Sequence, residues 1–550
     1  MKLFPVILCF FLLLATSNAQ IEDVPISNSV YEFLIRLEAK GLTGTIPMSH
    51  IPLQKQEIIV ILRNVRDNQK KLSGNESQIL LKYEKEFGIV NEEYSSVFPS
   101  KTHFNSIFWN GFIDKSEKVF YKYDDLVDNV DIRPLGSVDF IYNQGDSLRR
   151  VAIGTLGVKL SGTVDNKLGF YLQATNGRKI TGDKALAFYN PEYSKSFKFT
   201  NLESDIDLTQ SHVTYQNGWF RAKIGRMEEK MGAGLFQSTY ISTTSPPIDA
   251  ITLSANFSNF KYTYYLGSLI GLIESRETSG INTKISSKLM NQHRFSIRPS
   301  WGEIAFWESV IYSDRGMDIA YLNPLSFIKS LEHQLHDRDN SIMGMDFTIR
   351  PVANLIFKST FLLDDIIFEK IGTGYWSNKT AFNFSGLYSF DFNIDFGLEY
   401  ARVEPYTFSH FSPKNNYTND NFQIGSELQP NSEQYGLMIN YWYGERFPFQ
   451  LDLKYIRHGA NEYDSSGKMV KNVGGDARFT RRDPDFQTGF PGDPYEVTFL
   501  DGVLEKTLSL NLSFGYEIIN NLYLMASYQF LNTNQKSDNY IRLMILLNEF

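Results

Sequence analysis

The chain has 550 residues, with 62 acidic and 54 basic side chains and a formal net charge of −8 at pH 7. No basic stripe runs through it, which argues against nucleic acid as a partner. Aromatic residues make up 15% of the chain, while mean hydropathy is slightly negative at −0.27. Apart from the first twenty residues, no apolar run approaches the ~20 residues of a membrane helix. This combination fits a transmembrane β-barrel, in which every second residue meets lipid. A large soluble β-protein is the alternative that composition leaves open.

Residues 1–19 are predicted to be a secretory signal peptide. A positive start is followed by the apolar run 4–15, and small residues occupy the −3 and −1 positions of a cleavage site between Ala19 and Gln20. The single cysteine, Cys9, lies in this segment. The mature chain is therefore expected to have no disulfide, no thiolate metal site and no cysteine nucleophile.

Three helices are predicted in residues 20–98, from apolar positions repeating with a period near 3.6. The first ends at Gly41, and the second covers roughly 53–67. The third follows Ser73, where Glu76 completes a capping box. Three helices of this size can form a small bundle, so we expect a helical domain that is periplasmic or plugs a lumen.

From about residue 99 to 550 the apolar pattern changes to a period of two, which is typical of half-buried strands. We count about 18 such strands, often ~10 residues long, the length that crosses a bilayer at a tilt. The clearest examples are 168–174, 260–266, 391–400, 435–443, 449–455, 508–516 and 522–530.

Short turns such as 164–167 and 518–521 contrast with long polar loops at 175–205, 404–433 and 459–505. This asymmetry is typical of outer-membrane barrels. An open sheet of this size would expose long edges, and closure removes them. We therefore predict a large antiparallel outer-membrane β-barrel over residues 99–550, wide enough to enclose a lumen.

The chain ends in Phe550, after the apolar stretch 540–547. A terminal aromatic residue on the last strand is a signal that barrel-assembly machinery commonly reads. The fit is imperfect because Ile541 and Leu543 fall on the opposite file from Phe550. An ordinary C-terminal strand is the alternative.

The polar files of the predicted strands are expected to line the lumen, and the clearest members are Asp391, Asp395, Glu399, Asp452 and Lys454. We also expect two acids of the polar region 300–365, Glu308 and Asp346, to face the lumen. An ionised side chain at mid-membrane costs about 2–4 kcal/mol for Arg or Lys and less for Asp or Glu.

Glu308 and Asp346 should therefore point into the lumen, with Arg226 or Arg338 as partners. A structural network that holds the barrel and a plug is one interpretation of this polar region. A ligand site is the other, because carboxylates, amides and aromatics suit sugar hydroxyls.

Catalytic signatures are mostly absent, so we predict no enzyme activity, no cofactor and no metal site. His333 and His336 lack a clear third ligand and are interpreted as part of a solvated loop. Gly232-Ala233-Gly234 predicts a tight turn or a luminal constriction and not a phosphate site. His410 beside Ser409 is the only suggestive pair for an outer-membrane hydrolase.

A series of short motifs resembles the Wzi family of capsule-assembly outer-membrane proteins. Their order along the chain, and no single motif, carries the resemblance, which covers roughly 100–550. The motifs are Gly225-Arg226-Met227-Glu228, Gly232-Ala233-Gly234, Ser245-Pro246-Pro247, His293-Arg294, Glu308, Tyr312, Tyr321-Leu322-Asn323-Pro324, Asp339-Asn340, Asp346, Asp364-Asp365, Glu399-Tyr400 and Pro405-Tyr406-Thr407. The chain departs from the family at Lys230-Met231, where an aromatic residue is more usual.

The resemblance implies a barrel of about 18 strands with a plugged lumen. It also implies a lectin-like role, in which the protein attaches or assembles capsular polysaccharide or exopolysaccharide at the cell surface. The expected partners are cell-surface polysaccharide, outer-membrane lipid and the barrel-assembly machinery. The helical domain is similar to S-layer-homology modules, so peptidoglycan is a further hypothetical partner. A porin or solute-uptake channel is the alternative function.

No motif identifies the sugar-binding residues, so the candidate ligand site is chosen from the clustering of polar residues. It comprises Arg226, Glu308, Arg338, Asp339, Asn340, Asp346, Asp364, Asp365 and Glu399.

Overall fold

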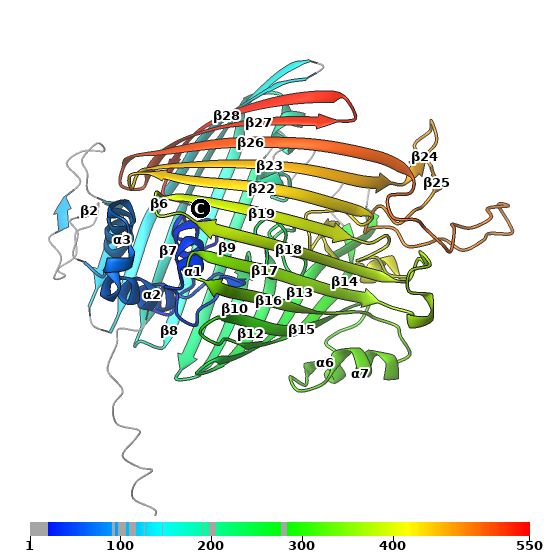
Figure 1. The fold of residues 1–550 in the computed structure, drawn as a ribbon, viewed down its shortest axis with the longest axis horizontal. Helices are drawn as coiled ribbons and strands as arrows, with labels where there is room; N and C mark the ends of the chain where they lie inside the picture. Colours follow the sequence, from blue (N-terminus) through cyan, green and yellow to red (C-terminus); the bar gives the residue numbers. More distant parts are fainter. Residues whose placement is uncertain are drawn as a thin grey trace, which may run out of the picture.

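The structure is a computed structural model that describes residues 20–90, 94–96, 106–108, 117–125, 127–145, 147–189, 191–196, 205–276 and 283–549 (Figure 1). The predicted signal peptide 1–19 and the terminal Phe550 lie outside the described residues. The predicted domain boundary at residue 98 lies outside them as well, and these three features stay predictions.

The three predicted helices are confirmed as α1 (Val30–Lys40), α2 (Lys55–Asp67) and α3 (Gly74–Glu86). Helix α1 ends at Gly41, whose φ of 75° is readily adopted by glycine. Helix α3 begins with the predicted capping box, because the Ser73 hydroxyl accepts a hydrogen bond from the Glu76 N–H at 3.1 Å. Their apolar faces pack into one cluster that includes Phe33, Leu62 and Tyr83.

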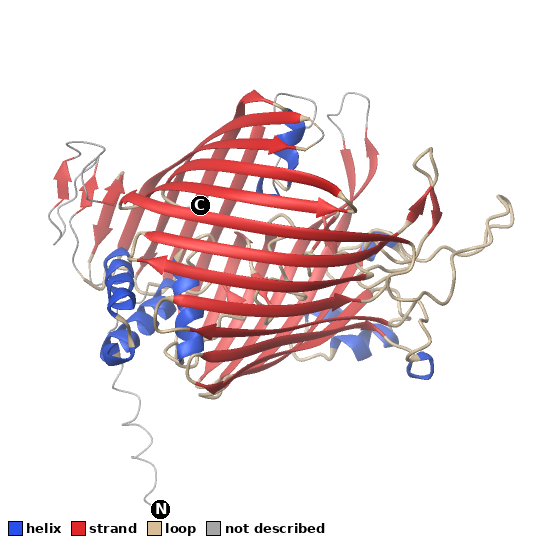
Figure 2. Cartoon of the chain, turned by 45° about the horizontal axis from the view of Figure 1, so that its top comes forward, coloured by secondary structure: helices blue, strands red, loops and turns tan. Residues whose placement is uncertain are grey.

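Eighteen antiparallel strands form a closed barrel, which confirms the predicted fold (Figures 1 and 2). The last strand pairs with the first, so that Ile545 lies opposite Val138. The strands are β6 (Asn129–Gln144), β7 (Leu148–Val164), β8 (Leu168–Gly182), β9 (Asp205–Asn217), β10 (Phe220–Met227), β12 (Ile248–Phe257), β13 (Phe260–Arg276), β14 (Thr283–Ile297), β15 (Gly302–Ser313), β16 (Asn340–Val352), β17 (Leu355–Asp365), β18 (Lys379–Ser389), β19 (Ile394–Val403), β22 (Ser432–Tyr443), β23 (Phe447–Ala460), β26 (Val503–Ile519), β27 (Leu522–Thr533) and β28 (Lys536–Leu547).

The two ends of the barrel differ in their connections. One end has the short turns 165–167, 218–219, 258–259, 298–301, 353–354, 390–393, 444–446 and 520–521. The other end has the long loops 183–204, 228–247, 314–339, 366–378, 404–431 and 461–502. This is the asymmetry of outer-membrane barrels, so the barrel lies in the outer membrane and the long-loop end faces outward.

The remaining elements are short. The helices are α4 (Lys184–Tyr189), α5 (Pro191–Ser194), α6 (Ile319–Leu322) and α7 (Ile328–Gln334). The strands are β1 (His50–Ile51), β2 (Tyr94–Ser96), β3 (Ser106–Phe108), β4 (Glu117–Val119), β5 (Tyr121–Asp124), β11 (Lys230–Met231), β20 (Thr418–Asn419), β21 (Phe422–Gln423), β24 (Glu462–Tyr463) and β25 (Met469–Lys471). Among the described residues, no helix is both long enough and apolar enough to cross a membrane.

The helices α1 to α3 occupy the short-turn end of the barrel (Figure 1). Trp442, at the end of β22, belongs to their apolar cluster. Ion pairs attach the helices to the barrel wall, with Arg36 2.5 Å from Asp395 and Lys358 2.6 Å from Glu38. Since these charges are buried, each one depends on its partner to compensate for lost hydration.

Two long loops turn inward and fill one side of the lumen. In the loop 228–247, β11 pairs with β1 next to the helices, and the Tyr240 ring stacks on Trp307 of β15 at a centroid distance of 3.8 Å. The loop 404–431 packs on it, and the Tyr417 hydroxyl donates a hydrogen bond to the Tyr240 carbonyl. One side of the lumen is therefore obstructed between the helices and the long-loop end.

Two details of the predicted strands are wrong. The strand predicted at 391–400 begins at Ile394, because residues 390–393 form a turn in which Asn393 has a φ of 66°. Asp391 therefore lies in this exposed turn and does not line the lumen. The predicted loop at 175–205 begins later as well, since β8 continues to Gly182.

Candidate functional site

The nine residues predicted as a ligand site do not converge. Four of them, Asn340 and three acids, lie on the luminal face of the wall, and the others lie on its outer face or in the long loops.

The three luminal acids, Asp346, Asp364 and Glu399, hold the inward loops and the wall together. Glu399 accepts hydrogen bonds from the backbone N–H groups of residues 235, 236 and 237, at 2.7, 3.2 and 2.9 Å. Asp364 accepts one from the Phe408 N–H at 2.7 Å. These carboxylates match the structural-network interpretation, because backbone donors of the plug already occupy their oxygens.

Asp346 faces the lumen as predicted, but its partner is Arg294, at 3.1 Å. Neither Arg226 nor Arg338 reaches it. Arg226 lies at the outer rim, 3.1 Å from Asp249 and partly exposed. Arg338 is in the loop 314–339, 2.8 Å from Asp318.

The predicted orientation of Glu308 is wrong. Its neighbour Trp307 faces the lumen against Tyr240, and adjacent strand residues point to opposite faces. Glu308 therefore points outward, where its Oε1 atom accepts a hydrogen bond from the Ile328 N–H at the start of α7. Helix α7 covers Glu308 from outside. The side chain is therefore buried without facing the lumen.

The last three predicted residues support loops. Asp339 accepts hydrogen bonds from Arg315 and from the Tyr321 hydroxyl, the latter at 2.9 Å. The Asn340 amide donates to the Asn415 carbonyl. Asp365 accepts a hydrogen bond from the Ser377 hydroxyl at 2.9 Å and so fixes the end of the loop 366–378.

The most ligand-like feature at the long-loop end is a groove of about 490 Å³, which we call the loop groove. Loops 366–378 and 461–502 and the outer end of β19 form it. It is lined by Ile366, Ile371, Gly372, Thr373, Gly374, Tyr375, Trp376, Asn378, Thr380, Arg402, Glu404, Pro405, Val497, Thr498 and Phe499.

The side chains of the loop groove combine aromatic faces with fixed charges. The Arg402 guanidinium lies 3.6 Å from the centre of the Phe499 ring and 2.6 Å from the Glu404 carboxylate. Trp376 packs edge-on against Tyr406, and its indole N–H has no hydrogen-bond partner among the described residues. Sequence analysis missed this groove; a tryptophan in a polar loop was the only local signal.

A second cavity of about 370 Å³ lies in the unobstructed side of the lumen, and we call it the luminal chamber. Its wall mixes polar and apolar side chains, with the charged residues Asp452, Lys454 and Arg542 and apolar ones such as Ile141 and Met525. The other lining residues include Ser509, Asn511, Ser513, Ser527, Gln529 and Tyr540. Asp452 and Lys454 thus line the lumen as predicted.

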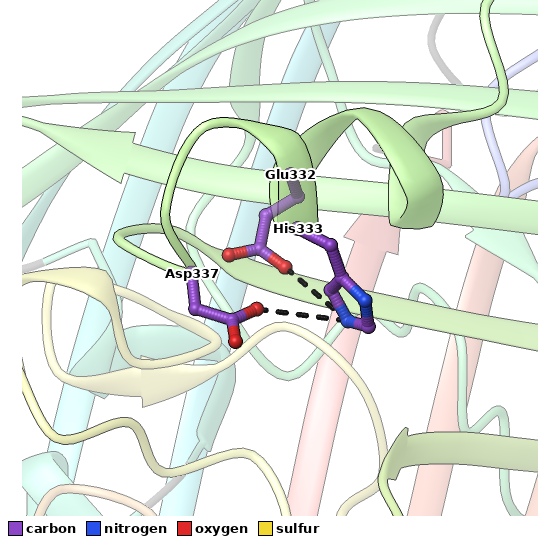
Figure 3. A group of neighbouring side chains, drawn as sticks. All are labelled: Glu332, His333 and Asp337. Carbon is purple, nitrogen blue, oxygen red and sulfur yellow. Dashed lines mark ion pairs between the residues drawn. The ribbon is translucent and has the colours of Figure 1, made fainter.

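Glu332, His333 and Asp337 bring three possible metal-ligand atoms within 4.8 Å of one another (Figure 3). The predicted solvated loop is thus partly helical, since His333 lies in α7, and its neighbours of suitable chemistry are Glu332 and Asp337, not His336. The Glu332 carboxylate is buried and accepts hydrogen bonds from the Asp339 N–H and the Ser341 hydroxyl. Burial raises the pKa of Glu332 to about 7, and the neighbouring Asp337 adds to this.

The Ser409 and His410 side chains do not form a nucleophile–base pair. The Ser409 hydroxyl donates to the Tyr406 carbonyl, and His410 Nδ1 accepts a hydrogen bond from the Ser412 N–H. Each side chain thus stabilises its own turn.

The fold is similar to that of Wzi, an outer-membrane protein of Escherichia coli. The two chains are 10% identical, the match covers 96% of this chain and 99% of that one, and the TM-score is 0.56. Two further similar structures are OprD of Pseudomonas aeruginosa (13% identity, 76% and 92% coverage, TM-score 0.43) and OccAB4 of Acinetobacter baumannii (11%, 76% and 97%, 0.44). The comparison with curated protein sequences finds no significant match. The sequence model of the capsule assembly protein Wzi family matches residues 141–538, and the chain therefore belongs to this family.

Proposed function

We propose that the chain binds a polysaccharide in the loop groove and thereby helps to attach or assemble capsule or exopolysaccharide at the cell surface. The groove carries this proposal because it lies at the long-loop end and exposes aromatic and charged groups together. The E. coli relative is described as a carbohydrate-binding β-barrel involved in group 1 capsule assembly, which supports the same function here.

The chemistry of the loop groove suits a sugar. The half-buried Trp376 side chain lines the groove and offers it part of an apolar ring surface. Arg402 and Glu404 add a donor and an acceptor in a fixed geometry. Asp365 has a positioning role in this proposal, because it anchors the loop that carries Trp376.

We also propose that the chain is not an enzyme. In support, the Ser409 and His410 side chains bond to different backbone groups and not to each other. Contact between the helical domain and peptidoglycan is a further proposal, motivated by the position of the helices at the short-turn end. Recognition of the C-terminus by the barrel-assembly machinery is proposed from the sequence alone.

Binding of purified protein to the cell-surface polysaccharide of its own bacterium tests the main proposal. We expect Trp376→Ala and Arg402→Ala each to lower affinity by about tenfold or more, the scale of one lost charged or stacking contact. Phe486→Ala is the matched control, since this aromatic side chain of the loop 461–502 is exposed and lies outside the groove. Equal affinities for all four proteins would place the binding surface elsewhere, and no binding by the wild type would reject the function.

The luminal chamber favours one alternative, a channel for small polar solutes. Single-channel recordings separate the two functions, because the inward loops should prevent steady conductance if the chain is a plugged polysaccharide binder. Large, steady current steps would instead support the channel.

A further inference from the structure

The loop 314–339, which we call the flap, lies on the outer face of the barrel wall (Figure 1). It leaves the outer end of β15, descends along the wall through α6 and α7, and returns to β16. Glu308, which meets the start of α7, is five residues from the end of its strand, or about 17 Å along it. The Tyr262 hydroxyl, near the short-turn end of β13, donates a hydrogen bond to the Pro324 carbonyl. The flap therefore reaches the depth at which barrels meet the hydrocarbon of the membrane.

The wall beneath the flap is polar, although it faces outward. Asn291 donates a hydrogen bond to the Tyr321 carbonyl of the flap at 3.0 Å and accepts one from the Tyr312 hydroxyl. Tyr264 and His293 are paired across β13 and β14 on the same face. Such side chains are unfavourable against lipid, because hydrocarbon offers them no hydrogen-bond partner.

Two buried groups under the flap are incompletely paired. Neither ring nitrogen of His293 has a hydrogen-bond partner among the described residues, and the Glu308 Oε2 atom has none either. The His293 Nδ1 atom lies 3.7 Å from Glu308 Oε1. Without the flap both side chains would face lipid, so this part of the wall suits a membrane only when it is covered.

The outer side of the flap, in contrast to the polar wall beneath it, is apolar. Ile319 and Leu325 are each 83% exposed, and Met317 and Phe327 are exposed as well. Over residues 316–328 the only charged residue is Asp318, and Arg338 pairs with it at 2.8 Å. The apolar half of the flap thus continues the apolar outer surface of the barrel.

We propose that the flap is a re-entrant membrane segment: the exposed apolar side chains of residues 316–328 contact lipid acyl chains, while its Tyr321 and Pro324 carbonyls bond to the wall. It replaces the barrel wall as the lipid-contacting surface over β13 to β15 and seals the polar side chains beneath it. The occupant of its exposed apolar face is lipid, because this face is continuous with the wall that already contacts lipid. This proposal is independent of polysaccharide binding.

Spin labels in lipid nanodiscs test the proposal, and the predicted mature chain contains no cysteine that would compete for the label. Leu325→Cys and Ile319→Cys each carry one nitroxide, and collision with oxygen is compared with collision with a water-soluble nickel chelate. Leu156→Cys, at a 75% exposed position on β7, is the lipid reference. Phe486→Cys, at a 98% exposed position in the loop 461–502, is the water reference.

We expect both flap labels to favour oxygen over the nickel chelate by about as much as the label at position 156. Ratios close to that of position 486 would overturn the proposal. Dipolar coupling between labels at position 325 on two copies would show that a protein surface covers the flap, and this too would overturn it. Because both positions are exposed, these variants should fold as the wild type does.

Discussion

The Arg36 guanidinium lies 2.5 Å from the Asp395 carboxylate, which joins the first helix of the chain to the lumen side of β19. The same guanidinium lies 2.7 Å from Glu76 of α3. One cation therefore holds two helices to each other and to the barrel.

Arg36→Ala should leave the buried Asp395 carboxylate without its cation, at a cost of about 3–5 kcal/mol, whereas Glu76 keeps Lys40 at 2.7 Å. We expect faster amide hydrogen exchange in α1 and α3, with smaller changes in the barrel strands. Arg63→Ala is the control, since this residue of α2 is exposed, and it should change stability by no more than about 0.5 kcal/mol. Equal exchange in the two variants would mean that apolar packing alone seats the helices.

Glu399→Ala should release the loop 228–247 from the wall. It removes the acceptor of three backbone hydrogen bonds, each worth about 1.5–3 kcal/mol when the acceptor is charged. We expect open-channel current steps in planar bilayers that the wild type lacks. Glu445→Ala, in a short turn at the other end, should show none. A silent Glu399→Ala channel would indicate that the helices alone close the lumen.

Gly474→Ala should disturb the contact between the two largest outer loops. A Cβ atom there would lie 2.4 Å from the Tyr406 nitrogen, and the residue has a φ of 72°. Gly467 has a φ of 81°, but no described residue would lie within 4 Å of its Cβ atom, so Gly467→Ala carries only the conformational cost of about 1–2 kcal/mol. Limited proteolysis of the loop 461–502 should be clearly faster in Gly474→Ala. Equal cleavage rates would show that the loop adapts.

The loop 404–431 should loosen on acidification because of His410. Burial, assisted by the charge of Lys379, lowers the pKa of His410 from 6.5 to about 4. The folded loop therefore holds the imidazole neutral, and its stability falls as the pH drops from about 6.5 to about 4. We expect hydrogen exchange in this loop to accelerate over that range in the wild type and to stay flatter in His410→Asn. Parallel profiles would assign the effect to another group.

The repeating patterns of the sequence predicted most of the fold, because helices and strands depend on interactions between residues close in the sequence. The Ser73 capping box and the period-two file in β26 each depend on neighbours a few residues apart. The start of β19 was misplaced because a turn residue such as Asn393 continues the alternation of the strand. Alternation cannot distinguish a strand from the turn that precedes it.

The candidate site was harder to predict, because it depends on contacts between distant segments. Alternation indicates that Glu308 and Trp307 face opposite sides, but not which side is covered by a flap. Likewise, Trp376 and Phe499 belong to different loops, and only the closed barrel brings them to one groove. The sequence predicted that Glu308 and Asp346 are buried. It could not identify their partners, the Ile328 N–H and Arg294, which are distant in the sequence.

The pairing of β28 with β6 also implies an order in which the parts of the chain fold. The ring closes only when the last strand meets the first, a contact between residues about four hundred positions apart, and such contacts form late. The three helices precede the barrel in the chain and rely on local contacts, so they can form early. The final strand then encloses preformed helices, and a chain whose helices fold slowly would close with its short-turn end unfilled.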